Sequence, residues 1–154
     1  MSAPRVLVIE DGEEYTHNLT RYLGGDFDFV RAGDGHEALT LASGAGTFQA
    51  VFLDMRFDRV PADRLLGDLA SVADRFNGDA DRATRFLEDN QGTYVLAALR
   101  EGGHGLPVIF SYDFDSEPRR WQNLSRRFGP VSYLTDNASP DQIRERLRDA
   151  TCLV

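Results

Sequence analysis

The chain has 154 residues, 42% of them hydrophobic and 27% charged, which is the balance of a soluble globular protein and enough for one domain with its own core. The formal net charge of −8 argues against nucleic acid and anionic membranes as partners, because both are polyanions. No apolar run approaches the ~20 residues of a membrane span, and a single cysteine cannot form an internal disulfide, so we expect a cytoplasmic protein.

Short apolar runs alternate with amphipathic stretches along the chain. Val6–Ile9 is continuously apolar, which is typical of a strand buried on both faces of a sheet. Further strands are predicted at Phe27–Arg31, Phe48–Leu53, Leu106–Phe110 and Val131–Leu134. Helices are predicted at Glu13–Leu23, Asp34–Ala42, Gly92–Glu101, Ser116–Phe128 and from Ser139 onward. Five repeats of strand and helix predict a parallel sheet with helices on both faces and a ligand site beyond the carboxyl ends of its strands.

The interval between the third and fourth predicted strands is long for one crossover connection, since a complete strand–helix–strand unit needs ~30 residues. Apolar residues recur there at helical spacing and predict a helix over Ala62–Phe76; they are Leu65, Leu69, Val72 and Phe76. A second helix is predicted over Ala80–Glu88. We therefore expect an inserted helical hairpin at about residues 57–90, whose apolar stripe serves core packing or, alternatively, a partner.

Carboxylates stand at the ends of two predicted strands. Glu10 and Asp11 follow the first strand, and Asp54 follows the third, so the three would meet at one edge of the sheet. Keeping them ionised there requires a cation, and Mg²⁺ suits all-oxygen ligation. Asp54 could also act as a nucleophile, because a carboxylate can form an acyl phosphate. Ser111, at the end of the fourth strand, could hydrogen-bond a phosphoryl oxygen.

Several segments together resemble a response-regulator receiver domain of the chemotaxis-receiver type. The matching segments, in family order, are Arg5–Asp11, Ala32–Leu39, Ala50–Asp54, Leu106–Ser111 and Val131–Thr135. The resemblance implies a flavodoxin-like (βα)5 fold of the α/β class: a doubly wound parallel sheet of order 2-1-3-4-5, in a single domain over residues 1–154, with the helical insertion between strand 3 and helix 3. It also implies the site residues: Asp54 as phosphoacceptor, Glu10, Asp11, Asp54 and the Arg56 backbone carbonyl as Mg²⁺ ligands, and Ser111 and Tyr133 as switch residues.

The sequence departs from the family pattern at three places near this site. The chain contains no lysine, and Asp136 stands where the family has one. A charge-assisted hydrogen bond is worth ~1.5–3 kcal/mol, so its loss would weaken the phosphorylated state roughly 10–100-fold. Tyr112 follows Ser111 where the family keeps a small residue, and the predicted insertion begins just after Asp54. Candidates to replace the lysine electrostatically are Arg56, Arg119 and Arg120.

Three functions are compatible with these residues. The first is an atypical receiver, not an enzyme, that accepts a phosphoryl group from a histidine kinase or phosphotransfer protein. Because no further domain follows the last predicted helix, we expect output by protein contact, through the fourth and fifth helices near Trp121 or through residues 57–90; a homodimer is left open. The alternative is a pseudo-receiver that binds proteins without phosphorylation. A haloacid-dehalogenase-like phosphatase resembles the chain less, because Arg56 stands where that class needs a second aspartate.

Overall fold

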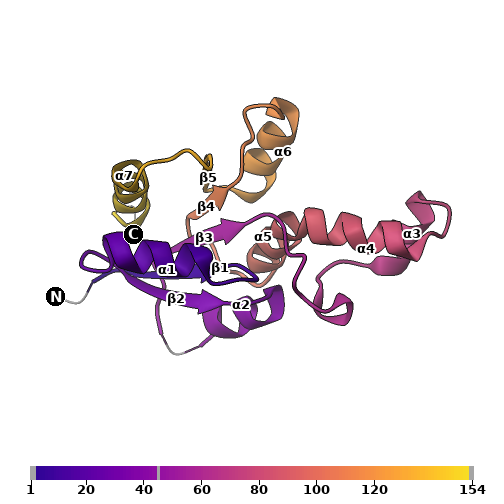
Figure 1. Cartoon of the computed structure of the whole chain (residues 1–154), viewed down its shortest axis with the longest axis horizontal. Coiled ribbons are helices and arrows are strands. Elements are labelled where there is room, and N and C mark those ends of the chain that lie inside the picture. The colour runs from indigo at the N-terminus through magenta and orange to yellow at the C-terminus, as the bar shows by residue number, and fades with distance from the viewer. Residues whose placement is uncertain (1–2, 45, 153–154) are drawn as a thin grey trace.

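One sheet of five parallel strands forms the centre of the molecule (Figure 1), in a computed structural model that describes residues 3–44 and 46–152. The strand order is β2-β1-β3-β4-β5, as the resemblance implied. The strands are β1 (Arg5–Ile9), β2 (Asp28–Ala32), β3 (Ala50–Asp54), β4 (Val108–Ser111) and β5 (Val131–Leu134). Each of them begins and ends within two residues of the predicted bounds.

Helices connect the strands and cover both faces of the sheet. They are α1 (Glu14–Leu23), α2 (Gly35–Ala42), α3 (Leu69–Arg75), α4 (Ala80–Asp89), α5 (Gln91–Glu101), α6 (Pro118–Phe128) and α7 (Pro140–Thr151). Ser139 begins α7 as predicted, because its side chain and that of Gln142 form a reciprocal capping box. In the described residues, no helix is both long enough and apolar enough to cross a bilayer.

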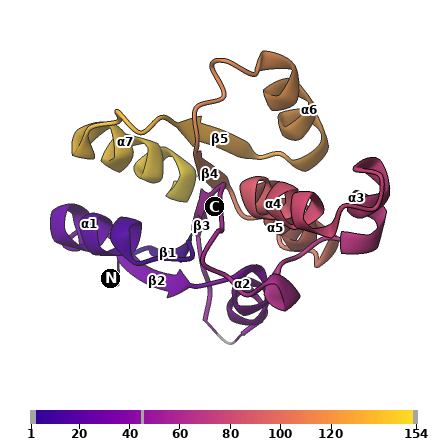
Figure 2. The same ribbon diagram turned by 45° about the vertical axis from the view of Figure 1, so that its right-hand side comes forward.

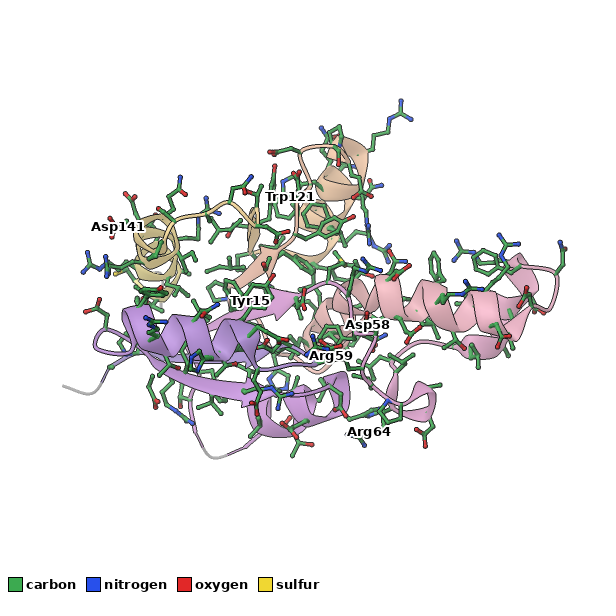
Figure 3. The ribbon with its side chains drawn as sticks, viewed as in Figure 1. Tyr15, Asp58, Arg59, Arg64, Trp121 and Asp141 are labelled. Carbon is green, nitrogen blue, oxygen red and sulfur yellow. The ribbon has the colours of Figure 1, made fainter. Side chains whose placement is uncertain are left out.

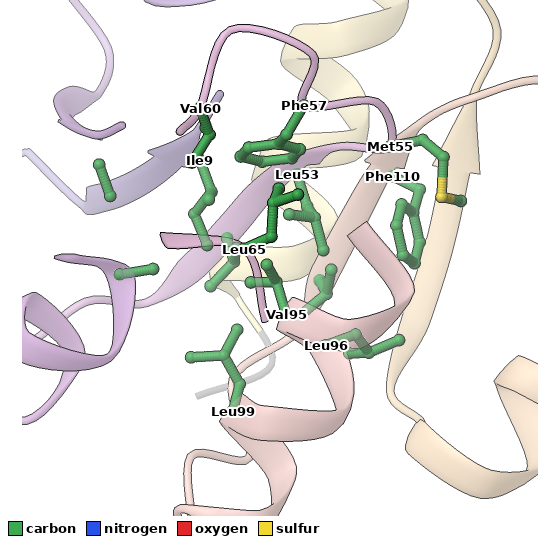
Figure 4. Packing of buried hydrophobic residues seen from close by; sticks show 14 of the residues in the cluster. Ile9, Leu53, Met55, Phe57, Val60, Leu65, Val95, Leu96, Leu99 and Phe110 are labelled. Carbon is green, nitrogen blue, oxygen red and sulfur yellow. The ribbon is translucent and has the colours of Figure 1, made fainter. Parts of the chain in front are cut away.

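The central strands supply two separate cores because successive side chains point to opposite faces. Val6 and Val8 of β1 pack with Leu19 and Leu23 of α1 and with Leu147 of α7. Figure 2 shows these two helices on one side of the sheet, with α2 and α5 on the other. On that second face, Leu7 and Ile9 pack with residues of α2 and α5; Figure 4 shows this core from close by, with Val95, Leu96 and Leu99 of α5.

The chain between β3 and α5 differs from the prediction. The continuous helix expected over Ala62–Phe76 is wrong: a short 3₁₀ turn over Ala62–Arg64 is followed by extended backbone at Leu65, with φ −69° and ψ 140°. Gly67 then has φ 109°, a conformation that favours glycine. Asp68 caps α3, since its side chain accepts hydrogen bonds from two backbone N–H groups of the first turn. Leu65 therefore reaches the core from outside a helix.

Helices α3 and α4 pack against each other and project from the end of the molecule near α5 (Figure 1). The prediction of α4 is confirmed, because Asp79 caps it and Leu87 is buried on its inner side. Leu69 of α3 is 40% exposed, whereas Val72 is buried. The predicted apolar stripe therefore does not form one buried face: Val72 contributes to the core and Leu69 faces solvent. That residues 57–90 are an insertion relative to the family stays a prediction.

Candidate functional site

Asp54 lies at the carboxyl end of β3, directly beside Ser111 in the parallel register with β4. Its Oδ1 accepts a hydrogen bond from the backbone N–H of Met55 at 2.8 Å. Burial raises the pKa of Asp54 to about 7, and the negative charges of Asp11 and Glu10 add to this shift. Hydrogen bonds from the backbone N–H groups of Met55 and Arg56 oppose it. This carboxyl therefore keeps its proton to a much higher pH than an ordinary aspartate when no cation is bound.

The segment after Asp54 is held by the first turn of α5. The backbone N–H of Gly92 donates to the Met55 carbonyl at 2.9 Å. A Cβ atom at position 92 would lie 2.5 Å from the Asp54 carbonyl oxygen and 2.9 Å from the Met55 Cα. A glycine at this position thus allows α5 to approach the strand end closely, which fixes the backbone that carries the Asp54 side chain.

Glu10 has a structural role that sequence reasoning missed. Its carboxylate is buried and accepts hydrogen bonds from the backbone N–H of Tyr15 at 3.0 Å and from the N–H and hydroxyl of Thr16, both at 2.6 Å. Because Glu13 at the N-cap position makes no side-chain capping bond, Glu10 satisfies the first turn of α1 from outside it. A metal ion would have to share this carboxylate with three existing donors.

Asp11 lies in the loop between β1 and α1 and bonds to the loop that follows β3. Its Oδ2 accepts from the backbone N–H of Arg59 at 2.9 Å, and the Arg59 side chain pairs with Glu14 at 2.8 Å. In the part of the chain that the structure describes, no three His, Cys, Asp or Glu residues are grouped tightly enough to form a ready metal site. The oxygen-only donors around Asp54 nevertheless suit Mg²⁺, which commonly uses one or two carboxylates and keeps several waters.

Tyr15 is a second residue that the sequence did not reveal. The Ser111 hydroxyl donates to its phenolic oxygen at 2.8 Å, and its ring packs against Phe52 with centroids 5.4 Å apart. Burial raises the pKa of Tyr15, the hydrogen bond from Ser111 opposes this, and the charges of Asp54, Asp136 and Glu10 raise it further. The tyrosine hydroxyl therefore lies in the electric field of the acidic site. Nothing in its helical spacing distinguishes it from an ordinary core residue.

The candidates to replace the family lysine are engaged elsewhere or lie at the surface. Arg56 pairs with Asp89 of α4 at 3.1 Å. Arg120 pairs with Glu117 at 3.2 Å and donates to the Asn90 side chain at 2.6 Å, while Arg119 is exposed on α6. Among the described residues, the guanidinium groups of these arginines make no hydrogen bond to Asp54; only the backbone N–H of Arg56 does. Asp136 is exposed in the loop between β5 and α7, as expected for an acid that turns toward solvent.

Tyr133 belongs to an aromatic cluster at the β5 edge of the sheet. Its ring lies 5.4 Å from Phe114 and 4.8 Å from Trp121, measured between centroids. Its hydroxyl donates to Asp115 in the loop after β4. Tyr112 joins the cluster through Phe114, at 4.7 Å between ring centroids, and its hydroxyl donates to Glu117, the residue that precedes α6. These contacts connect the segment that follows β4 to the start of α6.

The comparison with solved structures shows which fold this chain shares with known proteins. No protein-family model matches the sequence, and no curated protein does. Among solved structures, the receiver domain of a Francisella response regulator superposes with a TM-score of 0.64 and 20% identity, covering 97% of this chain and 98% of that chain. Chemotaxis protein CheY4 of Vibrio cholerae gives 0.63 and 15%, covering 97% and 99%. A CheY-like receiver domain protein of Methanospirillum hungatei gives 0.63 and 15%, covering 99% and 96%.

Proposed function

We propose that this chain, which has the fold of response-regulator receiver domains, is an atypical receiver of a two-component or phosphorelay system. The observation that carries the proposal is the placement of Asp54: a carboxyl of pKa about 7 at the end of β3, beside Ser111 and near two further acids. In the proposed reaction, an Asp54 oxygen attacks the phosphorus of a phosphohistidine on a kinase or phosphotransfer protein. The P–N bond breaks, the imidazole leaves, and an acyl phosphate forms on Asp54.

Mg²⁺ is the cofactor we propose for this step. Asp11, Asp54 and the Arg56 backbone carbonyl would hold it, with water completing the shell. Glu10 was predicted as a fourth ligand, and it would contribute only by giving up part of its bonding to Tyr15 and Thr16. The ion would neutralise the charge that builds up between the carboxylates and the phosphoryl oxygens. A cation there would also favour the ionised form of Asp54, which is the nucleophile.

The proposed receiver is atypical because its residues supply no cation where the family has a lysine. Asp136 adds a negative charge in that region, and the hydroxyls of Tyr15 and Ser111 already bond to each other. An acyl phosphate would have to recruit Ser111 away from Tyr15. Output would follow by protein contact, through the α6 surface that carries Trp121 or through residues 57–90.

A second candidate is a pseudo-receiver that binds partners without phosphorylation. The same contacts favour it, because Glu10, Ser111 and Tyr133 are each already bonded within the protein. A haloacid-dehalogenase-like phosphatase is less well supported, since that class needs an acid where Arg56 pairs with Asp89. In both receiver hypotheses the chain is a signalling protein and not an enzyme.

Intact-mass measurement after incubation with acetyl phosphate and Mg²⁺ tests the proposal. The expected result is one added phosphoryl group that is lost in Asp54→Asn and without metal. Asp113→Asn, an exposed acid after β4, is the matched control that should still be modified. An unmodified protein, under conditions in which an ordinary receiver is fully modified, would favour the pseudo-receiver.

A further inference from the structure

A cavity of about 470 Å³ lies between α1 and α7, on the face of the sheet away from α2 and α5. It begins at the strand ends beside Ser111 and follows α1 toward Leu23. Figure 3 shows α1, with Tyr15 labelled, below α7, where Asp141 is labelled. The lining residues come from α1, β3, β4, β5, α7 and the loop before α7; they are Tyr15, Asn18, Leu19, Tyr22, Leu23, Phe52, Ser111, Leu134, Thr135, Asp136, Ala138, Pro140 and Ile143.

The larger part of the cavity is apolar. Leu19, Leu23 and Phe52 form its inner wall and are 4%, 1% and 2% exposed. Ile143 closes it from the side of α7, and Tyr22, 53% exposed, stands at the outer edge. Small-molecule sites commonly have volumes of ~300–1,000 Å³, with mostly apolar walls and a few polar groups that converge. This cavity has both properties.

The polar groups gather at the end near the strand termini. The Tyr15 and Ser111 hydroxyls bond to each other there, and Thr135 and Asp136 approach from the loop before α7. Of the described residues that line the cavity, Asp136 alone carries a charge at neutral pH. Asp54 and Glu10 do not line it, but their negative charges act on the Tyr15 hydroxyl. The polar end is therefore an electronegative one that offers several acceptor oxygens.

We propose that this cavity binds a small organic cation: a protonated amine at the Tyr15–Ser111–Asp136 end, with an aromatic or branched apolar body against Leu19, Leu23 and Phe52. An ammonium group brings three donors and no acceptor, which matches the acceptor oxygens of Asp136, Tyr15 and Ser111. An anionic ligand would be repelled by the negative charges of Asp136, Asp54 and Glu10, and none of the described residues that line the cavity carries a positive charge to offset this repulsion. The proposal concerns the unphosphorylated protein, in which Ser111 bonds to Tyr15, and it does not require that Asp54 can accept a phosphoryl group.

A proton–nitrogen NMR titration with phenethylamine tests the proposal, and phenethyl alcohol serves as the neutral probe of the same shape. The amine should bind saturably and shift the amides of Leu134, Thr135, Ala138 and the α1 residues that line the cavity. Its affinity should exceed that of the alcohol about threefold, because the ammonium faces the exposed carboxylate of Asp136 at the mouth of the cavity. Higher salt should weaken binding of the amine more than binding of the alcohol.

Three variants assign the effect to the cavity. Asp136→Asn should lower the affinity for the amine about threefold and leave that for the alcohol unchanged. Asp149→Asn removes the same charge from an exposed position on α7 outside the cavity and should leave both affinities unchanged. Ala138→Trp should obstruct the cavity and abolish binding of both probes, with circular dichroism confirming the fold. Equal affinity for the two probes, binding that survives Ala138→Trp, or no saturable binding of the amine would each overturn the proposal.

Discussion

Ser111 donates a hydrogen bond to the phenolic oxygen of Tyr15 at 2.8 Å, although 96 positions separate the two residues in sequence. The bond joins the end of β4 to the first turns of α1 and lies beside the Asp54 carboxyl. The Ser111 hydroxyl donates its proton to the Tyr15 oxygen. A phosphoryl group on Asp54 would therefore compete with Tyr15 for this hydrogen-bond donor. The pair is therefore the contact through which a change at Asp54 would first reach α1.

Replacing Tyr15 by phenylalanine should destabilise the protein by about 1 kcal/mol, because the largely buried Ser111 hydroxyl loses its partner. The free energy of unfolding in urea measures the change. Tyr22→Phe is the matched control, since Tyr22 is 53% exposed on the same helix and its loss should cost less than about 0.5 kcal/mol. Equal effects of the two substitutions would mean that the bond to Ser111 contributes nothing to stability.

The raised pKa of Asp54 predicts a pH-dependent stability in metal-free buffer. The folded protein holds a proton on this carboxyl up to pH about 7, whereas the unfolded chain releases it near the ordinary aspartate pKa of 3.8. Since the folded state binds more protons in that interval, stability should fall as pH rises from about 4 to 7. Asp54→Asn should remove this slope and be more stable than the native protein at pH 8, by up to about 4 kcal/mol. Urea unfolding at several pH values, with EDTA present, measures the slope, and identical slopes in the two proteins would contradict the prediction.

Mg²⁺ should counter that loss of stability. A ligand that binds only the folded state adds about 2.7 kcal/mol at a concentration 100 times its dissociation constant. We expect the midpoint of thermal unfolding to rise with Mg²⁺ at pH 8, and the increase to disappear in Asp11→Asn and Asp54→Asn. Asp141→Asn, an exposed acid on α7, should keep the full response. If the midpoint still rises with Mg²⁺ in both Asp11→Asn and Asp54→Asn, the ion binds at another site.

The contacts of Glu10 predict that it supports α1 independently of any metal. Glu10→Ala leaves two backbone N–H groups of Tyr15 and Thr16 without an acceptor and should cost about 2 kcal/mol in metal-free buffer. Glu13→Ala is the control, because Glu13 is exposed and makes no capping bond. The free energy of unfolding in urea, measured with EDTA, checks the prediction. If Glu10→Ala and Glu13→Ala unfold with the same free energy, Glu10 does not support α1 and can act only as a metal ligand.

The sequence predicts those parts of the fold that depend on residues close together in the chain. Val6–Ile9 and the other strands follow from continuous apolar runs, and the start of the last helix at Ser139 follows from its immediate neighbours. The helix over Ala62–Phe76 was wrongly predicted because the left-handed turn at Gly67 outweighs the apolar spacing on either side of it. The helical spacing of the apolar residues carries no information about the backbone conformation of Gly67.

For the candidate site, the sequence indicated which acids stand at strand ends but not what their oxygens contact. Asp54 and Ser111 are neighbours because parallel register puts their strand ends together. The capping of α1 by Glu10 and the bond between Ser111 and Tyr15 depend on how α1 packs against the sheet, which only the folded chain determines. The metal ligands and the switch roles of Ser111 and Tyr133 stay predictions.

The aromatic cluster around Trp121 supplies a direct readout of whether a signal leaves the site. Trp121 is the single tryptophan of the chain, and its ring lies 4.8 Å from that of Tyr133, whose hydroxyl bonds to Asp115. If phosphorylation draws Ser111 toward Asp54, the end of β4 and the loop carrying Asp115 should shift, and the fluorescence of Trp121 should change with acetyl phosphate and Mg²⁺. Asp54→Asn should abolish the change.

Asp115→Asn separates the movement of Tyr133 from the phosphorylation itself. The substitution weakens the bond that holds the Tyr133 hydroxyl, because a neutral amide accepts a hydrogen bond less strongly than a carboxylate. We expect it to alter the resting fluorescence of Trp121 and to reduce the further change on phosphorylation, while the mass of the modified protein stays the same. Full phosphorylation with no fluorescence change in the native protein would mean that the site accepts the group without passing the signal to α6, which would favour an output surface on residues 57–90 over one on α6.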